Sequence, residues 1–171
     1  MIGTQVILAA RVAMGLVFVT AALGKIGSRR RIRETSAALA GFGRPPIASW
    51  PVLVVAIGGM EAVTVVLVAV PGTQRIGLGL GMALLGVFCA AIAVSIRRGR
   101  SVTCRCFGGA GGVLGTRHLV RNVVLAGLAG TALAVDQAMP IDLGAGLAAV
   151  VLGAGAAMIV IHWDDLATAF S

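Results

Sequence analysis

The sequence predicts an all-α integral membrane protein, built as an antiparallel bundle of four to five transmembrane helices. Hydrophobic residues make up 58% of the 171 residues and charged residues only 12%, about half the charged share of soluble proteins. A soluble domain of this composition lacks the polar side chains needed to cover its surface. Apolar segments of about 20 residues, the length that crosses a bilayer, recur along the chain. Residues 1–171 are therefore expected to form a single multi-pass domain of the cell (inner) membrane, in contact with lipid.

Five segments are predicted to form the membrane helices. They cover residues 4–24, 47–70, 76–96, 119–135 and 143–163. Small residues are frequent in the third and fifth segments, and small side chains let helices approach closely in lipid. The connections after the second and fourth segments are short, which makes the helices on either side antiparallel neighbours. The first segment carries Arg11 and resembles a signal peptide, but the basic residues that follow favour a retained helix.

The connection between the first two segments is long and begins with a basic cluster. Residues 28–50 read SRRRIRETSAALAGFGRPPIASW, with Ile32 and Leu39 among the apolar positions. Pro45 and Pro46 cannot continue a helix. Two interpretations are open here: a short interfacial helix lying on the membrane surface, or a disordered basic loop.

The net charge is +8, and its distribution bears on orientation. In a soluble protein this charge would suggest nucleic acid, but here basic connections orient membrane helices and meet anionic lipid, so no nucleic-acid partner is expected. Most basic residues follow the first and third segments, and the positive-inside rule places that side in the cytoplasm. These residues are Lys25, Arg29, Arg30, Arg31, Arg33, Arg44, Arg97, Arg98, Arg100, Arg105 and Arg117.

A close cysteine pair marks the connection between the third and fourth segments. Residues 101–109 read SVTCRCFGG, and Cys104 and Cys106 flank Arg105. Positive neighbours raise the thiolate fraction of a cysteine, and strained, exposed disulfides exchange readily. Gly108 leaves room in the loop for the sulfur of a partner protein. The pair is therefore predicted to form a redox-active disulfide.

Other interpretations of the cysteine pair are weighed against this one. Zinc takes about four ligands, and only His118 lies nearby in sequence, so no zinc site is predicted. Copper(I), which two thiolates can bind, and two incidental reduced cysteines stay open as alternatives. Cys89 lies within the apolar third segment and is expected to be a small core side chain.

Glu61 lies near the middle of the second segment, where a lone carboxylate costs about 3 kcal/mol. It is expected to be paired, protonated or functional. The candidate partners lie at helix ends: Lys25, Arg121, Arg11 and, as a hydrogen-bond donor, Asn122. One interpretation is a buried ion pair that fixes helix register. The other is a proton relay for thiol oxidation, to which His118 could contribute.

Several of these motifs together resemble the methylamine-utilisation MauE family and its DoxX-like relatives. The motif CRCFGG, which includes Phe107, is the most specific of them. Further similarity lies in ALGKIGS around Lys25, in GGMEAV around Glu61, and in the Arg121–Asn122 pair that opens the fourth segment. The resemblance extends over the first four segments, and the fifth goes beyond the four-helix core of the family.

The resemblance implies a thiol–disulfide oxidoreductase that works beside a thioredoxin-like partner and helps other proteins acquire disulfides or metal centres. It also implies an architecture similar to four-helix thiol oxidoreductases that pass electrons to quinone, so quinone enters as a cofactor by analogy. Family resemblance places the cysteines on the outer face of the membrane, whereas the charge distribution places them inside, and both orientations stay open.

Two further function classes compete with the oxidoreductase. The first is a non-catalytic membrane scaffold that docks a redox or maturation protein, with cysteines that are structural or incidental. The second is a small-solute or metal transporter, which ranks last because the sequence shows neither inverted repeats nor broken helices. Replacement of both cysteines by serine separates the scaffold from the oxidoreductase.

Overall fold

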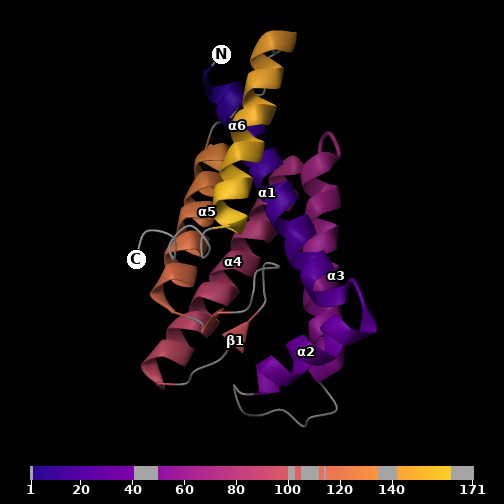
Figure 1. Ribbon diagram of the computed structural model, residues 1–171. Coiled ribbons are helices and arrows are strands. Elements are labelled where there is room, and N and C mark those ends of the chain that lie inside the picture. Colours follow the sequence, from indigo (N-terminus) through magenta and orange to yellow (C-terminus); the bar gives the residue numbers. More distant parts are fainter. Residues whose placement is uncertain are drawn as a thin grey trace.

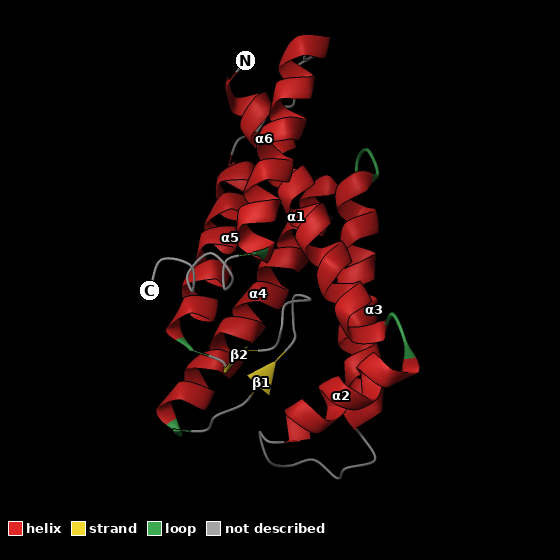
Figure 2. Ribbon diagram, in the orientation of Figure 1, coloured by secondary structure: helices red, strands yellow, loops and turns green. Residues whose placement is uncertain are grey.

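The computed structural model describes residues 2–40, 50–99, 103–104, 112–113, 115–134 and 142–162. Over these residues the chain forms six helices and one two-stranded antiparallel sheet (Figures 1 and 2). The helices are α1 (Ile2–Ile26), α2 (Arg29–Ala40), α3 (Trp50–Ala69), α4 (Gln74–Arg97), α5 (Thr116–Ala134) and α6 (Leu143–Ile161). The strands are β1 (Thr103–Cys104) and β2 (Gly112–Val113).

The predicted helical bundle is confirmed in its main features. Each of the five predicted segments coincides with one helix, namely α1, α3, α4, α5 or α6, with ends that differ by less than about one turn. The basic stretch after α1 forms α2 over residues 29–40, so a disordered loop is the wrong interpretation for those residues. The short sheet was not predicted, because two-residue strands carry no periodicity in sequence.

Within the described ranges, four helices are long and apolar enough to cross a membrane: α1 from Gly3, α3, α4 and α6. The fourth predicted segment, now α5, is not among these four. Its first turns carry Arg117, His118 and Arg121, which lower its mean hydropathy. It lies against α4 and α1 in the bundle. The four apolar helices fit a multi-pass membrane protein.

Helix α1 is the centre of the bundle. Its buried positions recur every three or four residues, the period of one helix face: Ala10, Ala13, Met14, Val17, Phe18 and Ala21. That face and its flanks contact α3, α5 and α6, and α1 also touches α2 and α4. Leu85 and Leu125, both fully buried, complete the same apolar cluster from α4 and α5.

The outer surface of the bundle is apolar. Large side chains such as Val52, Val63, Val151 and Leu152 are exposed on α3 and α6. In water such a surface would be an aggregation hazard, whereas in a bilayer it is the surface that lipid tails cover. The interior combines the apolar cluster around α1 with a few buried polar and charged side chains, among them Lys25 and Glu61.

A tight turn joins α3 to α4 and makes them antiparallel. Gly72 has a φ of +89°, a conformation that favours glycine. The Thr73 hydroxyl donates to the carbonyl oxygen of Leu67 at 2.8 Å, which satisfies one of the last carbonyls of α3. The predicted hairpin between these two segments is therefore confirmed.

Small residues set the closest helix contacts, as predicted for the glycine-rich segments. A Cβ atom added to Gly153 of α6 would lie 2.5 Å from the backbone oxygen of Ala9 and 2.9 Å from Val12 Cβ on α1. A Cβ added to Gly77 of α4 would lie 2.6 Å from the backbone nitrogen of Val68 on α3. These glycines allow the backbones of neighbouring helices to approach each other.

We expect Gly153→Ala to destabilise the protein by about 1–3 kcal/mol, because the new methyl group would force α6 away from α1. The matched control is Gly155→Ala on the same helix, where nothing lies within 4 Å of the added Cβ. That change should be neutral or stabilise the helix by up to about 1 kcal/mol. Thermal unfolding in detergent measures both, and equal midpoints for the two variants would contradict the close α1–α6 contact.

Candidate functional site

Buried polar side chains gather at one end of the bundle. Lys25 lies in the last turn of α1, and Ser95 lies in the last turn of α4. His118, Arg121 and Asn122 occupy the first turns of α5. Each of these side chains is at most 7% exposed. Because α1 and α4 finish where α5 begins, the antiparallel topology brings all of them to the same end of the bundle.

Glu61 enters this region from α3. The buried face of that helix runs through Val54, Gly58, Glu61, Thr64 and Val68 at helical spacing. Glu61 is fully buried, so the packing of α3 points its carboxylate into the bundle. Here the side chain needs a partner, because a carboxylate removed from water without one is costly.

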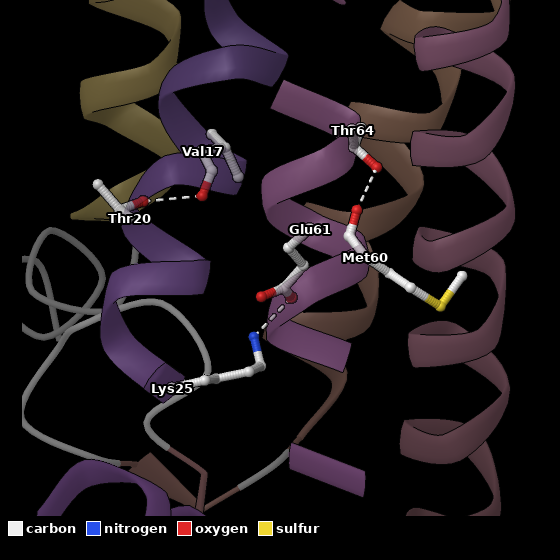
Figure 3. A network of polar contacts seen from close by, with 6 residues as sticks. All are labelled: Val17, Thr20, Lys25, Met60, Glu61 and Thr64. Carbon is white, nitrogen blue, oxygen red and sulfur yellow. Dashed lines mark hydrogen bonds and ion pairs between the residues drawn. The ribbon is translucent and has the colours of Figure 1, made fainter. Parts of the chain in front are cut away.

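Lys25 is that partner. Its Nζ lies 2.6 Å from Glu61 Oε1, and the two side chains are 4% and 0% exposed (Figure 3). The sequence left three basic candidates open, and the structure brings Lys25 of α1 to Glu61 of α3. The pair joins residues that are 36 positions apart in the chain and fixes the register of the two helices.

Arg11, a predicted candidate partner of Glu61, instead bonds to backbone carbonyl groups of α3. Its Nε and one Nη donate to the carbonyl oxygen of Val68 at 3.0 and 2.9 Å, and that Nη also lies 3.4 Å from the carbonyl oxygen of Ala69. The prediction of Arg11 as a possible partner of Glu61 is therefore wrong. The cation instead satisfies carbonyl groups at the C-terminal end of α3, where the helix dipole is negative.

Further groups surround the Lys25 ammonium. Its Nζ lies 5.3 Å from the centre of the Phe88 ring on α4, a cation–π distance. It also lies within electrostatic range of Arg121 on α5. Lys25 of α1 thus interacts with a carboxylate of α3, an aromatic ring of α4 and a guanidinium group of α5.

The buried cluster also has unused hydrogen-bonding capacity. Among the described residues, Glu61 Oε2 and Asn122 Oδ1 accept no hydrogen bond, although both side chains are buried. Buried acceptors of this kind are normally satisfied by internal water or by a bound group. The arrangement can therefore hold a molecule with O–H or N–H donors, and a carboxylate with an open oxygen can accept a proton.

The cysteine segment lies at the same end. Cys104 ends β1, where its backbone pairs with Gly112 of β2, and β1 lies beside α2 (Figure 1). Because the β1–β2 hairpin connects the end of α4 to the start of α5, it leaves and re-enters the bundle where the buried cluster lies. The remaining predicted residues of the segment lie outside the described residues: Arg105, Cys106, Phe107 and Gly108.

Cys89 lies on α4 as a partly buried free cysteine beside Phe88, outside the apolar core cluster, so its prediction as a core side chain is not borne out. Over the residues that the structure describes, there is no group of three or more His, Cys, Asp or Glu side chains that could hold a metal ion.

Sequence reasoning missed three residues of this region. Phe88 of α4 contacts Lys25, Ser95 is buried in the last turn of α4, and Thr64 is buried about one turn after Glu61 on α3. The Thr64 hydroxyl donates a hydrogen bond to the carbonyl oxygen of Met60, one turn earlier in α3 (Figure 3). Its helical spacing of three residues after Glu61 was the available signal, whereas Phe88 and Ser95 carried none.

Comparison with known proteins identifies the family. The family model described as Methylamine utilisation protein MauE matches residues 4–135, which include most of α1 and all of α2 to α5. The chain belongs to the MauE family. The protein named Methylamine utilization protein MauE from Paracoccus denitrificans is 33% identical over 165 residues, which cover 94% of this chain and 87% of that protein. No solved structure gives a significant match.

The MauE match confirms the resemblance drawn from the sequence motifs. It spans the whole polar end of the bundle, including Lys25, Glu61, the β1–β2 hairpin and Arg121. Helix α6 lies beyond the residues of the family match. The site residues and the family assignment therefore fall in the same part of this MauE chain.

Removal of one member of the buried pair should be costly. We expect Lys25→Met to lower the free energy of unfolding by about 3–5 kcal/mol, because Glu61 would keep a buried charge without its counter-ion. The double variant Lys25→Met/Glu61→Met should recover most of that loss, since apolar replacement of a whole buried pair is often neutral. Unfolding midpoints of the single and double variants measure the coupling.

Arg30→Met serves as the control, since it breaks the exposed Arg30–Glu34 pair of α2 and should leave the unfolding midpoint unchanged. If the losses of Lys25→Met and Glu61→Met simply add in the double variant, the two side chains do not act as a pair.

Proposed function

We propose that this MauE-family protein is a thiol–disulfide oxidoreductase of the cell (inner) membrane that exchanges a Cys104–Cys106 disulfide with a thioredoxin-fold partner. One observation carries the proposal. The cysteine segment begins in a hairpin at the end of the bundle where Lys25, Glu61, Arg121 and Asn122 are buried. Charged groups at the same end of the bundle as a redox pair can tune its thiol chemistry.

The proposed reaction is disulfide exchange. A thiolate of the partner attacks one sulfur of the Cys104–Cys106 disulfide, the bond between the two cysteines breaks, and a mixed disulfide forms. The partner's second thiolate then attacks the mixed disulfide. The partner leaves oxidised, Cys104 and Cys106 are left as two thiols, and the two protons of the partner thiols are transferred to them. The direction of the cycle reverses when the partner is the more oxidising of the two.

The buried cluster supplies two aids to this chemistry. The positive charges of Lys25 and Arg121, against one buried carboxylate among the described residues, that of Glu61, favour a negatively charged sulfur at this end. The open Oε2 of Glu61 provides a place for a proton that leaves or returns to a thiol. His118, buried at the start of α5, is a second proton carrier at this end.

A quinone is the proposed electron acceptor, by analogy with other membrane thiol oxidoreductases. The buried donors Lys25 and Arg121 are the side chains that suit its carbonyl oxygens, in a region also lined by Phe88. When bound, a quinone would accept the two electrons and two protons released as the cysteine thiols become a disulfide.

The name of the Paracoccus denitrificans relative places that protein in methylamine utilisation. By family membership, we propose that this chain serves the maturation of a protein used in the same process. The exchange then acts on the cysteines of another protein, which thereby acquires its disulfides or becomes ready for its metal centre, rather than on methylamine itself.

A second candidate function is a non-catalytic scaffold that docks a redox or maturation protein. The Lys25–Glu61 pair favours it to the extent that a buried ion pair can serve solely to fix α1 against α3. In that case the hairpin is a docking element and its sulfur chemistry is incidental.

Serine replacement of the cysteines tests the proposal. We expect Cys104→Ser and Cys106→Ser each to abolish disulfide exchange with a thioredoxin-fold partner, while one of the two traps a mixed disulfide. Cys89→Ser, on α4, is the matched control and should leave exchange intact. Trapping with a membrane-impermeant thiol reagent in intact cells reads the redox state and also shows which side of the membrane the pair faces. Full retention of cellular function by the double serine variant would establish the scaffold instead.

Glu61→Gln tests the proton role. Because glutamine keeps a hydrogen-bond acceptor for Lys25 and removes the proton-accepting carboxylate, we expect the exchange rate per folded molecule to fall by about 100-fold, the usual scale of acid–base catalysis. The pH dependence of the rate should also flatten. If the rate and its pH profile stay those of the wild type while only the unfolding midpoint falls, Glu61 acts as a structural residue alone.

A further inference from the structure

Exposed arginines gather at the hairpin end of the bundle. Four lie on α2, two close α4, and one begins α5. We call them the basic rim: Arg29, Arg30, Arg31, Arg33, Arg97, Arg98 and Arg117. At the opposite end, the described residues include only Arg75 and Asp142 as exposed charged side chains. Over the described residues, the surface charge is therefore strongly asymmetric along the bundle axis.

Little negative charge offsets the basic rim. Glu34 is the exposed acidic side chain on α2, and it is held by Arg30 at 2.7 Å. Glu61 is buried and paired with Lys25, so it does not reach the surface. Within the described part of the chain, the hairpin end thus presents a surface of excess positive charge around β1.

The packing of α2 holds the rim in place. Helix α2 lies against α3, α1 and β1, with Ser36 buried and Ile32 and Leu39 half-buried. Among the described side chains of α2, none of the large apolar ones is exposed. This helix therefore has no apolar face left to insert among lipid tails, and most of its exposed charged side chains are arginines.

We propose that the basic rim binds the phosphate groups of anionic phospholipids and thereby holds α2 and the β1–β2 hairpin at the membrane surface. Guanidinium groups bind phosphate oxygens through two parallel hydrogen bonds. Lipid is the occupant that the geometry favours, because the rim follows directly on membrane-crossing helices. Arg29 lies just after the end of α1 at Ile26, and α4 ends at Arg97. Both positions lie at or just after the ends of helices that are long and apolar enough to cross a membrane.

The test compares the intact protein in bilayer nanodiscs of phosphatidylcholine with nanodiscs that also contain phosphatidylglycerol. We expect phosphatidylglycerol to raise the thermal midpoint of the wild type, and native mass spectrometry to show it retained over phosphatidylcholine. The variant Arg29→Gln/Arg33→Gln/Arg97→Gln/Arg98→Gln should lower this preference at least about tenfold, since each basic residue near an anionic surface raises the affinity about fivefold.

The control is Arg75→Gln at the opposite end, which should keep the preference for phosphatidylglycerol. Salt near 1 M should weaken the wild-type preference, because the Debye length falls to about 3 Å.

Several outcomes would overturn the proposal. These are equal retention of both lipids by the wild type, an unchanged preference in the quadruple variant, stabilisation by free inorganic phosphate equal to that by lipid, or an acidic soluble protein that displaces the lipid from the rim. The proposal is independent of thiol exchange, because lipid retention can be measured in the Cys104→Ser/Cys106→Ser variant. Loss of exchange there with lipid preference kept separates the two.

Discussion

The structure depends on the cost of charge in a low-dielectric interior. Lys25 and Glu61 are both removed from water, and each is tolerable there because the other lies 2.6 Å away. Arg11 meets the same demand at a second place, by donating to the carbonyl oxygen of Val68. The central helix α1 is therefore tied to α3 at two separated positions, and each tie satisfies a polar group for which the bilayer offers no water.

The buried polar groups at the two ends of the bundle differ in what they bind. At the α3–α4 turn, the polar groups satisfy backbone carbonyls and their role is structural. At the hairpin end of the bundle lie the buried cations Lys25 and Arg121, a carboxylate with one open oxygen and an amide with an open oxygen. Among the described residues, the hairpin end combines buried acceptors that lack a hydrogen bond with the start of the cysteine segment, which is why the proposed chemistry is assigned to it.

The candidate site shows how far sequence reasoning reaches. A glutamate in the middle of an apolar segment implies a partner wherever it occurs, so the need for one at Glu61 follows from local composition. Local composition does not select the partner among Lys25, Arg121 and Arg11, since all three are basic residues in or beside apolar segments. The direction in which α1 and α3 pack selects Lys25. The same packing brings Phe88 and Ser95 into the region, and their sequence neighbours gave no sign of this.

By itself, the sequence determined the membrane class, the positions of the long helices, the close cysteine pair and the family, because each depends on residues adjacent in the chain. Tertiary structure decided the rest. It selected Lys25 for Glu61, made α2 a helix packed against α3, set α5 against α4 and α1 despite its polar first turns, and paired β1 with β2. These outcomes depend on contacts between residues far apart in sequence, whose free energies exist only once the helices have packed together.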